Sequence, residues 1–314
     1  MNSAVRPLPS RWTRAALAAV IGMSAALPLA AVAAEVKHAQ GVTEVAANPK
    51  KVIVLDLASL DTLDALGVPV AGAPTTPVPA RLKKYVANES VQVGTLFEPN
   101  YEVIFATDPD VIIVGGRSQP KFGELAKIAP TIDMTVDTKD LVGSVTRNTN
   151  TLATLFGKEK EGEQKLQALQ QSIASLKEKS AGAGTALIVL TTGGKMSAYG
   201  PGSRFGVLHD AFGFAAADAK LNTSNHGQAV SYEFITKTNP DWLFVIDRDA
   251  AIGREGASAK QMLDNELVRT TNAWKKQQVV YLDGMEWYLL GSAGLGALQE
   301  NVNQLTRALD GAKQ

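Results

Sequence analysis

The sequence predicts an α/β protein with two parallel-sheet lobes joined by one long helix. Three observations lead to this fold class: one segment occurs twice, short apolar runs alternate with helical patterns, and a long amphipathic stretch lies mid-chain. Two widely spaced copies do not make a solenoid, which stacks three or more short units. We therefore expect two lobes built on one plan, with a cleft between them.

The repeated segment spans residues 100–114 and 231–245, which read NYEVIFATDPDVIIV and SYEFITKTNPDWLFV and are identical at seven of fifteen positions. Asn100 and Ser231 are suitable helix N-caps. The apolar runs VIIV and LFVI, which follow the Pro-Asp turn, are typical of buried parallel strands. Each copy thus predicts a helix, a turn and a strand.

Short apolar runs also precede helical patterns elsewhere in both halves. Residues 51–55 form such a run, and the leucines after it recur at helical spacing and stop at Gly67. Residues 186–190 form a second run, followed after a Gly-rich loop by the expected helix in RFGVLHDAFG. This alternation predicts parallel sheets covered by helices.

The long amphipathic stretch covers residues 159–179, where four apolar residues recur at spacings of three, four and three among Glu, Gln and Lys. A helix of about twenty residues spans roughly 30 Å, enough to bridge two domains. A single rigid connector limits how far the lobes can open. The predicted division is an N-terminal lobe at 34–155, a connecting helix at 156–180 and a C-terminal lobe at 181–314.

Residues 1–33 predict a secretory signal peptide. Three arginines precede an apolar stretch at 15–30, and Ala-Val-Ala then fits a small-residue cleavage site, with cutting after Ala33 or Ala34. A membrane anchor is the alternative, but the run is short for a span. We expect a monomer free in the periplasm, without stable membrane insertion.

Composition excludes several function classes. Removing residues 1–33, which hold three Arg and no acid, leaves 28 basic and 31 acidic side chains, so the protein has no general attraction to nucleic acid. There is no cysteine, which excludes a lipidated N-terminal Cys, thiolate metal sites and thiol catalysis. A chain of this length can bury a core without disulfides.

Three arginines predict a cationic pocket. Arg117 and Arg248 each lie seven residues after the Asp of the repeat, just past a predicted strand, where open α/β sheets place their ligands. Arg204 lies in the glycine-bracketed loop YGPGSRFG. A solvated surface position is the alternative for each. Guanidinium groups offer forked, permanently charged donors, so together they favour an anion with several oxygens.

His226, in the loop NTSNHGQ, and Tyr288, in DGMEWYLLG, are candidate iron ligands. Imidazole nitrogen and phenolate oxygen both bind iron. The alternatives are a loop histidine bonded to backbone and a core tyrosine. Taken with the arginines, the pair suggests a ferric complex. With only three His, an all-protein zinc or manganese site is poorly supplied.

Glu102 and Glu233 are the paired acids of the repeat, each two residues after an expected N-cap. Carboxylates at helix starts interact favourably with the helix dipole, which accounts for an acid in the first turn. One acid on each lobe at a single offset would also form a two-pronged handle for a symmetric partner.

These motifs resemble the periplasmic iron-siderophore binding proteins that serve ABC importers, in the class whose lobes are joined by one long helix. The resemblance covers residues 40–310 and is carried by GTLFEPNYEVIFATDPDVIIVGG and VSYEFITKTNPDWLFVID. The sequence is further similar to the catecholate branch, which binds enterobactin-related or petrobactin-like ferric complexes. The missing lipobox Cys departs from tethered relatives and favours a free periplasmic protein.

The resemblance also implies the site and the partners. It implies an arginine triad and two iron-ligating residues, and it places paired helix-start acids against basic pockets of a permease dimer. Iron(III) would arrive within the siderophore complex, with no intrinsic cofactor. The corresponding residues here are Arg117, Arg204 and Arg248 for the triad, His226 and Tyr288 for iron, and Glu102 and Glu233 for docking.

Two alternatives to a catecholate binder remain. A haem or hydroxamate-siderophore binding protein would use the same fold. A secreted enzyme acting on an anionic substrate would need a nucleophile or metal beside a general base, and the motifs show none. We therefore expect a binding protein and not an enzyme.

Overall fold

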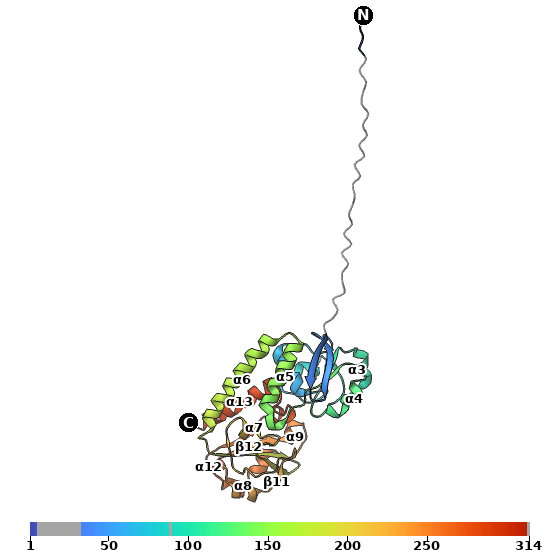
Figure 1. Cartoon of the computed structure of the whole chain (residues 1–314). Helices are drawn as coiled ribbons and strands as arrows, with labels where there is room; N and C mark the ends of the chain where they lie inside the picture. The colour runs from blue at the N-terminus through green and yellow to red at the C-terminus, as the bar shows by residue number, and fades with distance from the viewer. Residues whose placement is uncertain (5–32, 88–89, 313–314) are drawn as a thin grey trace. The chain divides into compact units, whose positions relative to one another are not determined.

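The computed structural model of the chain describes residues 1–4, 33–87 and 90–312, and Val32–Gln314 form one compact unit (Figure 1). Most of the predicted signal peptide, residues 5–32, lies outside the described residues. Ala33 and Ala34, the predicted cleavage positions, are the first residues of strand β1 (Ala33–His38). Within the described ranges, no helix has the length and apolarity needed to cross a membrane.

The first lobe contains a five-stranded parallel sheet in the order β5-β4-β3-β6-β7. Strand β1 pairs with β2 (Gly41–Ala46) in a separate antiparallel hairpin. The sheet strands are β3 (Val52–Val54), β4 (Gly72–Ala73), β5 (Val91–Gln92), β6 (Val111–Val114) and β7 (Thr131–Asp133). The helices are α1 (Leu57–Leu66), η1 (Ala80–Leu82), α2 (Lys83–Ala87), α3 (Tyr101–Thr107), η2 (Gln119–Lys121), α4 (Phe122–Leu125), η3 (Thr138–Asp140) and α5 (Leu141–Leu155).

The second lobe contains a six-stranded sheet in which β11-β9-β8-β12-β13 are neighbours and β10 also pairs with β8. Its strands are β8 (Thr185–Thr192), β9 (Lys195–Tyr199), β10 (Ala215–Ala216), β11 (Gln228–Val230), β12 (Trp242–Asp247) and β13 (Val279–Leu282). The helices are α7 (Val207–Asp210), α8 (Tyr232–Thr238), α9 (Arg248–Ala251), α10 (Ala259–Leu263), α11 (Glu266–Arg269), α12 (Asn272–Lys275), the π-helical turn η4 (Met285–Leu289) and α13 (Leu295–Gly311).

The second sheet is mixed and not purely parallel, because β9 runs antiparallel to both β8 and β11. The sequence predicts only a Gly-rich loop after β8. Thr192 pairs with Lys195 around Gly193 and Gly194, whose φ angles are 54° and 75°. Two consecutive residues with positive φ form the two-residue turn that suits a tight hairpin. The glycine pair was therefore the signal for an extra strand.

The two copies of the repeat fold alike. Asn100 accepts a hydrogen bond from Val103 N at the start of α3, and Ser231 accepts one from Phe234 N at the start of α8. Strands β6 and β12 follow at equivalent places and lie parallel to β3 and β8. The predicted helix, turn and strand are confirmed in both copies.

The Asp that both copies of the repeat share accepts backbone hydrogen bonds from the start of a neighbouring strand. Asp110 accepts hydrogen bonds from Lys50 N at 2.7 Å and Lys51 N at 2.8 Å, just before β3. Asp241 accepts one from Thr185 N at 3.0 Å, where β8 begins. The same carboxylate therefore aligns the start of the central strand in both sheets, which sets where the carboxyl ends of the strands lie.

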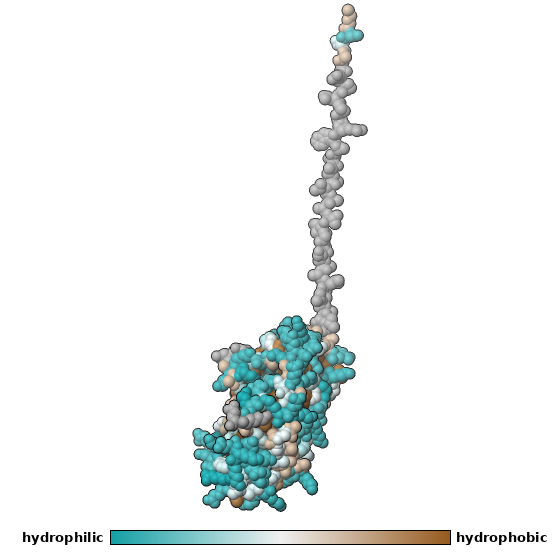
Figure 2. Space-filling model, turned by 90° about the vertical axis from the view of Figure 1, so that its left-hand side faces the viewer, coloured by the Kyte–Doolittle hydropathy of each residue, from teal (hydrophilic) through white to brown (hydrophobic). Residues whose placement is uncertain are grey.

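Two long helices run side by side along one flank of the two lobes (Figure 1). The predicted connecting helix is confirmed as α6 (Glu159–Ser180). Helix α13, in the range that sequence assigned to the second lobe, packs along α6 and also against α1. On the face shown in Figure 2, hydrophilic side chains dominate and hydrophobic ones are scattered.

Candidate ligand-binding site

Strand ends and one loop bring the three arginines to a single tyrosine. Arg117 follows β6 after two glycines, Arg248 directly follows β12, and Arg204 lies in the loop between β9 and α7. Their guanidinium carbons lie 5.8, 5.4 and 4.5 Å from the ring centre of Tyr288, respectively. These contacts join residues from both lobes, so the structure assembles four of the five residues predicted for the ligand.

Hydrogen bonds fix this arrangement. Arg248 Nε donates to the Tyr288 hydroxyl at 2.7 Å. Arg117 donates to the carbonyl oxygens of Tyr288 and Leu289 at 2.9 and 2.8 Å, and Arg204 donates to the Tyr288 carbonyl at 2.9 Å. The tyrosine is thus held through its backbone by two arginines and through its hydroxyl by the third.

The arginines change the acidity of Tyr288. Burial alone would raise the pKa of this phenol, but the hydrogen bond from Arg248 and the nearby guanidinium charges outweigh burial and lower the pKa below its ordinary value. The phenolate is the form that binds ferric iron. The site therefore favours the protonation state that a metal ligand needs.

Positive charge in the site is only partly balanced. Arg248 lies 3.7 Å from Asp249, which Arg254 also approaches at 3.8 Å. Over the described part of the chain, neither Arg117 nor Arg204 makes a salt bridge. Burial, and then the charge of Arg204, lowers the pKa of Arg117. An incoming anion would relieve this repulsion.

A cavity of ≈ 540 Å³ opens beside these residues. Arg117, Arg204 and Asp56 supply its charged groups, and apolar side chains make much of the remaining wall. Burial raises the pKa of Asp56 despite the opposing charge of Arg117. The apolar lining residues are Ala58, Phe97, Pro120, Met134, Val136, Leu289, Leu290 and Ala293. The cavity can therefore hold an anionic group against a hydrophobic surface.

His226 is the predicted site residue that the structure does not join to the others. It is exposed, and its backbone N–H donates to Ser224 Oγ at 3.3 Å. No hydrogen bond found among the described residues links its ring to Tyr288 or to the arginines. Its neighbour Asn225 does line the cavity, so the loop itself reaches the site.

Three further residues of the site were not predicted from the sequence. Asp56 caps α1 and faces Arg117, Thr192 accepts a hydrogen bond from Arg248 at 3.1 Å, and Phe97 lines the cavity while 62% exposed. Asp56 and Thr192 both stand at carboxyl ends of central strands, which is the position that singled out the arginines. The exposed Phe97 lies within the segment that carried the family resemblance.

The predicted docking acids occupy equivalent exposed positions. Glu102 is the second residue of α3 and Glu233 the second residue of α8, and both lie in the first helical turn. A hydrogen bond with the Ser231 side chain lowers the pKa of Glu233. Both carboxylates are therefore available to a partner outside the cleft.

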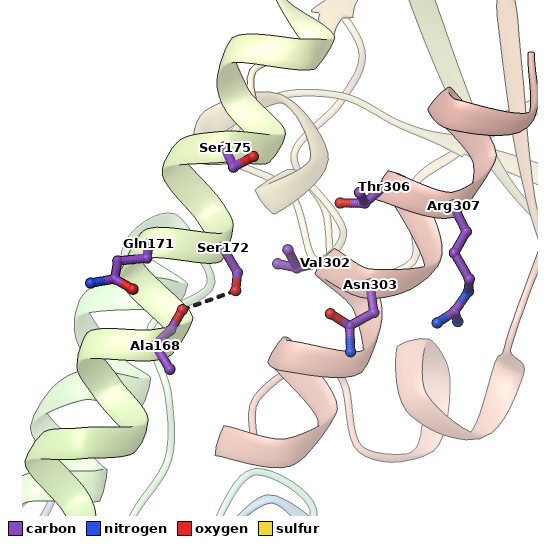
Figure 3. A pocket seen from close by; sticks show the side chains of 8 residues that line it. All are labelled: Ala168, Gln171, Ser172, Ser175, Val302, Asn303, Thr306 and Arg307. Carbon is purple, nitrogen blue, oxygen red and sulfur yellow. Dashed lines mark hydrogen bonds between the residues drawn. The ribbon is translucent and has the colours of Figure 1, made fainter. Parts of the chain in front are cut away.

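A second hollow, of ≈ 570 Å³, lies away from the cleft between α6 and α13 (Figure 3). Ser172 Oγ in its wall donates to the Ala168 carbonyl at 2.9 Å. Its one charged lining residue, Arg307, points away from α6 and pairs with Glu300 at 2.6 Å. This hollow lacks the converging charges of the cleft.

Two α/β lobes, a bridging helix and a cationic cavity define the class of extracytoplasmic solute-binding proteins. The chain belongs to the periplasmic binding protein family, whose model matches residues 52–285. The predicted fold class and the family resemblance are both confirmed.

Two relatives that are named for the ligand they bind are similar to most of the chain. The chain is 42% identical over 271 residues to the petrobactin-binding protein YclQ of Bacillus subtilis, covering 85% of each chain. It is 30% identical over 278 residues to the ferric-anguibactin-binding protein FatB of Vibrio anguillarum, covering 87% of this chain and 86% of that one.

Solved structures of siderophore-binding proteins also match the chain over most of its length. The crystal structure of YclQ matches with a TM-score of 0.86 at 40% identity, covering 89% of this chain and 99% of that chain. The periplasmic catecholate-siderophore binding protein VctP of Vibrio cholerae matches with a TM-score of 0.83 at 29% identity, covering 88% of this chain and 100% of that one. At 40% and 29% sequence identity, the two structures are related to this chain by sequence as well as by fold.

Proposed function

We propose that this protein binds a ferric catecholate siderophore in the cavity beside Tyr288 and delivers it to an inner-membrane ABC importer. The observation that carries the proposal is the convergence of Arg117, Arg204 and Arg248 on Tyr288. A tris-catecholate ferric complex is trianionic, and three guanidinium groups match that charge. Charge-assisted hydrogen bonds to such a ligand contribute ~1.5–3 kcal/mol each.

The named relatives support this ligand class, since YclQ is a petrobactin-binding protein and VctP a catecholate-siderophore binding protein. The cavity combines two arginines with an apolar wall, which suits an anionic complex that carries aromatic rings. The basic and apolar segment at the start of the sequence supports a periplasmic location.

Titration with a panel of ferric complexes tests the ligand class. Trp287 is fully buried beside Tyr288, so ligand binding is expected to quench intrinsic fluorescence. We expect ferric bis- and tris-catecholates to bind more tightly than ferric hydroxamates, which carry less negative charge, and than haem. Tighter binding of haem or of a hydroxamate would contradict the proposal. Mass spectrometry of the released ligand should find it unaltered, whereas a modified ligand would indicate an enzyme.

Iron coordination is the second part of the proposal. A siderophore with only two catecholates leaves two iron positions open, and we propose that Tyr288 and His226 fill them. Tyr288 already lies at the arginine cluster. His226 stands on the loop that places Asn225 in the cavity wall. A six-coordinate siderophore would need neither side chain.

Tyr288→Phe is expected to remove much of the visible charge-transfer colour of the bis-catecholate complex and to weaken its binding about tenfold or more. Tyr288 binds iron as the phenolate, so a protonated phenol must release its proton on ligation. Affinity of the wild-type protein should therefore rise with pH more steeply than affinity of the variant. Absorption spectra and titrations at several pH values provide the measurement.

A six-coordinate tris-catecholate serves as the control ligand for this variant. Its iron is already saturated, so Tyr288→Phe should change its affinity little. An unchanged visible spectrum of the bis-catecholate complex would show that Tyr288 does not bind iron.

A further inference from the structure

A cluster of charged groups, made of two buried carboxylates and one partly exposed arginine, lies behind the Tyr288 segment, outside the cavity. It consists of Asp61 on α1, Arg81 in η1 and Glu286 in η4, with Asp61 and Glu286 only 1% and 3% exposed. Arg81 Nε and Nη2 donate to Asp61 Oδ1 at 2.9 and 2.5 Å. Arg81 Nη2 also donates to Glu286 Oε2 at 2.9 Å, and Nη1 donates to Glu286 Oε1. One guanidinium thus joins two carboxylates from distant parts of the chain.

Asp61 fixes the cluster to the start of α13. Its Oδ2 accepts a hydrogen bond from Ala297 N at 2.8 Å, inside the first turn of that helix. A Cβ added at Gly294 or Gly296 would lie 2.2 or 2.8 Å from an Asp61 carboxylate oxygen. Only glycine leaves room for this approach. The helix start and α1 are therefore locked together through one carboxylate.

Glu286 connects the cluster to the ligand site. It lies two residues before Tyr288 in the same π-helical turn, and its carbonyl oxygen accepts a hydrogen bond from Ser292 N at 3.0 Å. The intervening Trp287 is fully buried and donates to Gln304 Oε1 at 3.2 Å. On the cavity side, Arg117 and Arg204 hold the Tyr288 carbonyl. The turn is clamped between arginines on two sides.

Stability alone is a weak reason for such a cluster. Buried ion pairs are often replaceable by apolar side chains without loss of stability, because desolvation offsets their attraction. Here two buried carboxylates share one arginine, and burial raises the pKa of both Asp61 and Glu286. Single π-helical turns are also uncommon and occur frequently at functional sites. The cluster secures a turn whose geometry determines where the Tyr288 hydroxyl points.

We propose that Arg81 and Glu286, anchored by Asp61, are positioning residues that orient Tyr288 towards the iron of the bound complex. This inference rests on the proposed function. None of the three residues lines the cavity. They act on the ligand through the shape of η4, as residues behind a metal ligand do when they set its orientation.

Arg81→Ala and Glu286→Ala test the inference with the bis-catecholate complex. Each is expected to lower its affinity about tenfold, the usual scale for outer-shell partners of a metal ligand. Each should also shift or weaken the charge-transfer band at saturating ligand, because the phenolate meets iron at a different angle. Affinity for the six-coordinate tris-catecholate should change by less than about twofold. Glu286→Gln, which keeps an oxygen acceptor for Arg81, should recover most of the band.

Two comparison variants separate positioning from general damage. Asp264→Ala breaks an exposed Arg–carboxylate pair, with Arg269, away from the site and should leave band and affinities unchanged. If an alanine variant fails to fold, the charge-transfer band and the affinity are measured on Arg81→Lys instead. Lysine keeps the positive charge, but its ammonium group cannot donate to both carboxylates in the geometry of a guanidinium, so a shifted band is still expected.

The outcomes distinguish this inference from the proposed function. A wild-type band and affinity in folded Arg81→Ala and Glu286→Ala, or in Arg81→Lys alone if those do not fold, would overturn the positioning role. So would equal losses for both ferric complexes accompanied by an unchanged band, which indicate a stabilising role only. If Tyr288→Phe itself keeps the band, iron ligation by Tyr288 fails first, whatever the cluster variants do.

Discussion

Replacing Arg248 by alanine is expected to weaken binding of a ferric bis-catecholate by more than tenfold. The substitution removes one permanently charged donor, and charge-assisted hydrogen bonds contribute ~1.5–3 kcal/mol, where 1.4 kcal/mol is a factor of ten in affinity. It also removes the hydrogen bond that Arg248 Nε donates to the Tyr288 hydroxyl at 2.7 Å. The variant therefore loses an anion contact and the group that orients the iron ligand.

The same variant should alter the titration of Tyr288. The hydrogen bond from Arg248 and its charge help to lower the pKa of this phenol against the effect of burial. Without Arg248, the pKa of Tyr288 is expected to rise. The phenolate absorbance should then appear at higher pH than in the wild-type protein. Loss of bis-catecholate affinity in the variant should be most pronounced at low pH and smaller at alkaline pH.

Arg254→Ala is the matched control. Arg254 also approaches Asp249, at 3.8 Å, but its side chain is 58% exposed, and none of its described contacts reaches Tyr288. Removing it lowers the positive charge by the same amount without touching the proposed site, so affinity should stay near the wild-type value. Arg117→Ala and Arg204→Ala should each weaken binding about tenfold. Wild-type affinity in all three arginine variants would exclude a cationic binding site.

Most of the fold could be predicted from the sequence, because the patterns that indicate it are local or occur twice. The two copies of the repeat carry their own N-caps, Asn100 and Ser231, and the structure uses both. The connecting helix has an apolar face at regular spacing, and α6 begins at the predicted residue, Glu159. Patterns of this kind depend on residues within one element, so they can be recognised without knowing the tertiary contacts.

Elements that depend on partners were harder to predict. Strand β9 follows two glycines, a pair that is typical of a loop when it is considered from the sequence alone. Its pairing with β11 joins residues about thirty positions apart, which no local pattern encodes. The π-helical turn η4 is set by contacts of Glu286 with Arg81, a residue far away in the chain. Such features are decided by tertiary contacts.

In the candidate site, too, some residues could be predicted from local patterns and others depend on tertiary contacts. Arg117 and Arg248 could be selected because the repeat places both after equivalent strands, and the structure brings both to Tyr288. Nothing in the sequence alone relates Tyr288 to Asp61 or Arg81, since the link passes through α1, η1 and the start of α13. His226 remains a prediction, because its exposed loop makes no described contact with the tyrosine.

Loss of both repeat glutamates is expected to abolish siderophore uptake by cells while leaving binding in solution intact. We propose that Glu102 and Glu233 engage basic pockets on the two halves of a permease dimer. Both are exposed at the second position of a short helix, one in each lobe, outside the cavity. Glu102→Ala combined with Glu233→Ala removes both contacts, and each single variant should transport at an intermediate rate.

Matched controls decide between docking and a helix-start effect. Glu124 and Glu266 are also exposed first-turn glutamates, one in each lobe, on α4 and α11 and outside the repeat. If helix dipoles are all that matters, the Glu124→Ala, Glu266→Ala pair should match the docking pair in melting temperature, and both should support near-normal uptake. If the repeat glutamates dock, only their loss stops transport, with affinity and melting temperature close to the wild-type values. Normal uptake by the Glu102→Ala, Glu233→Ala protein would reduce the repeated acids to ordinary helix-start residues.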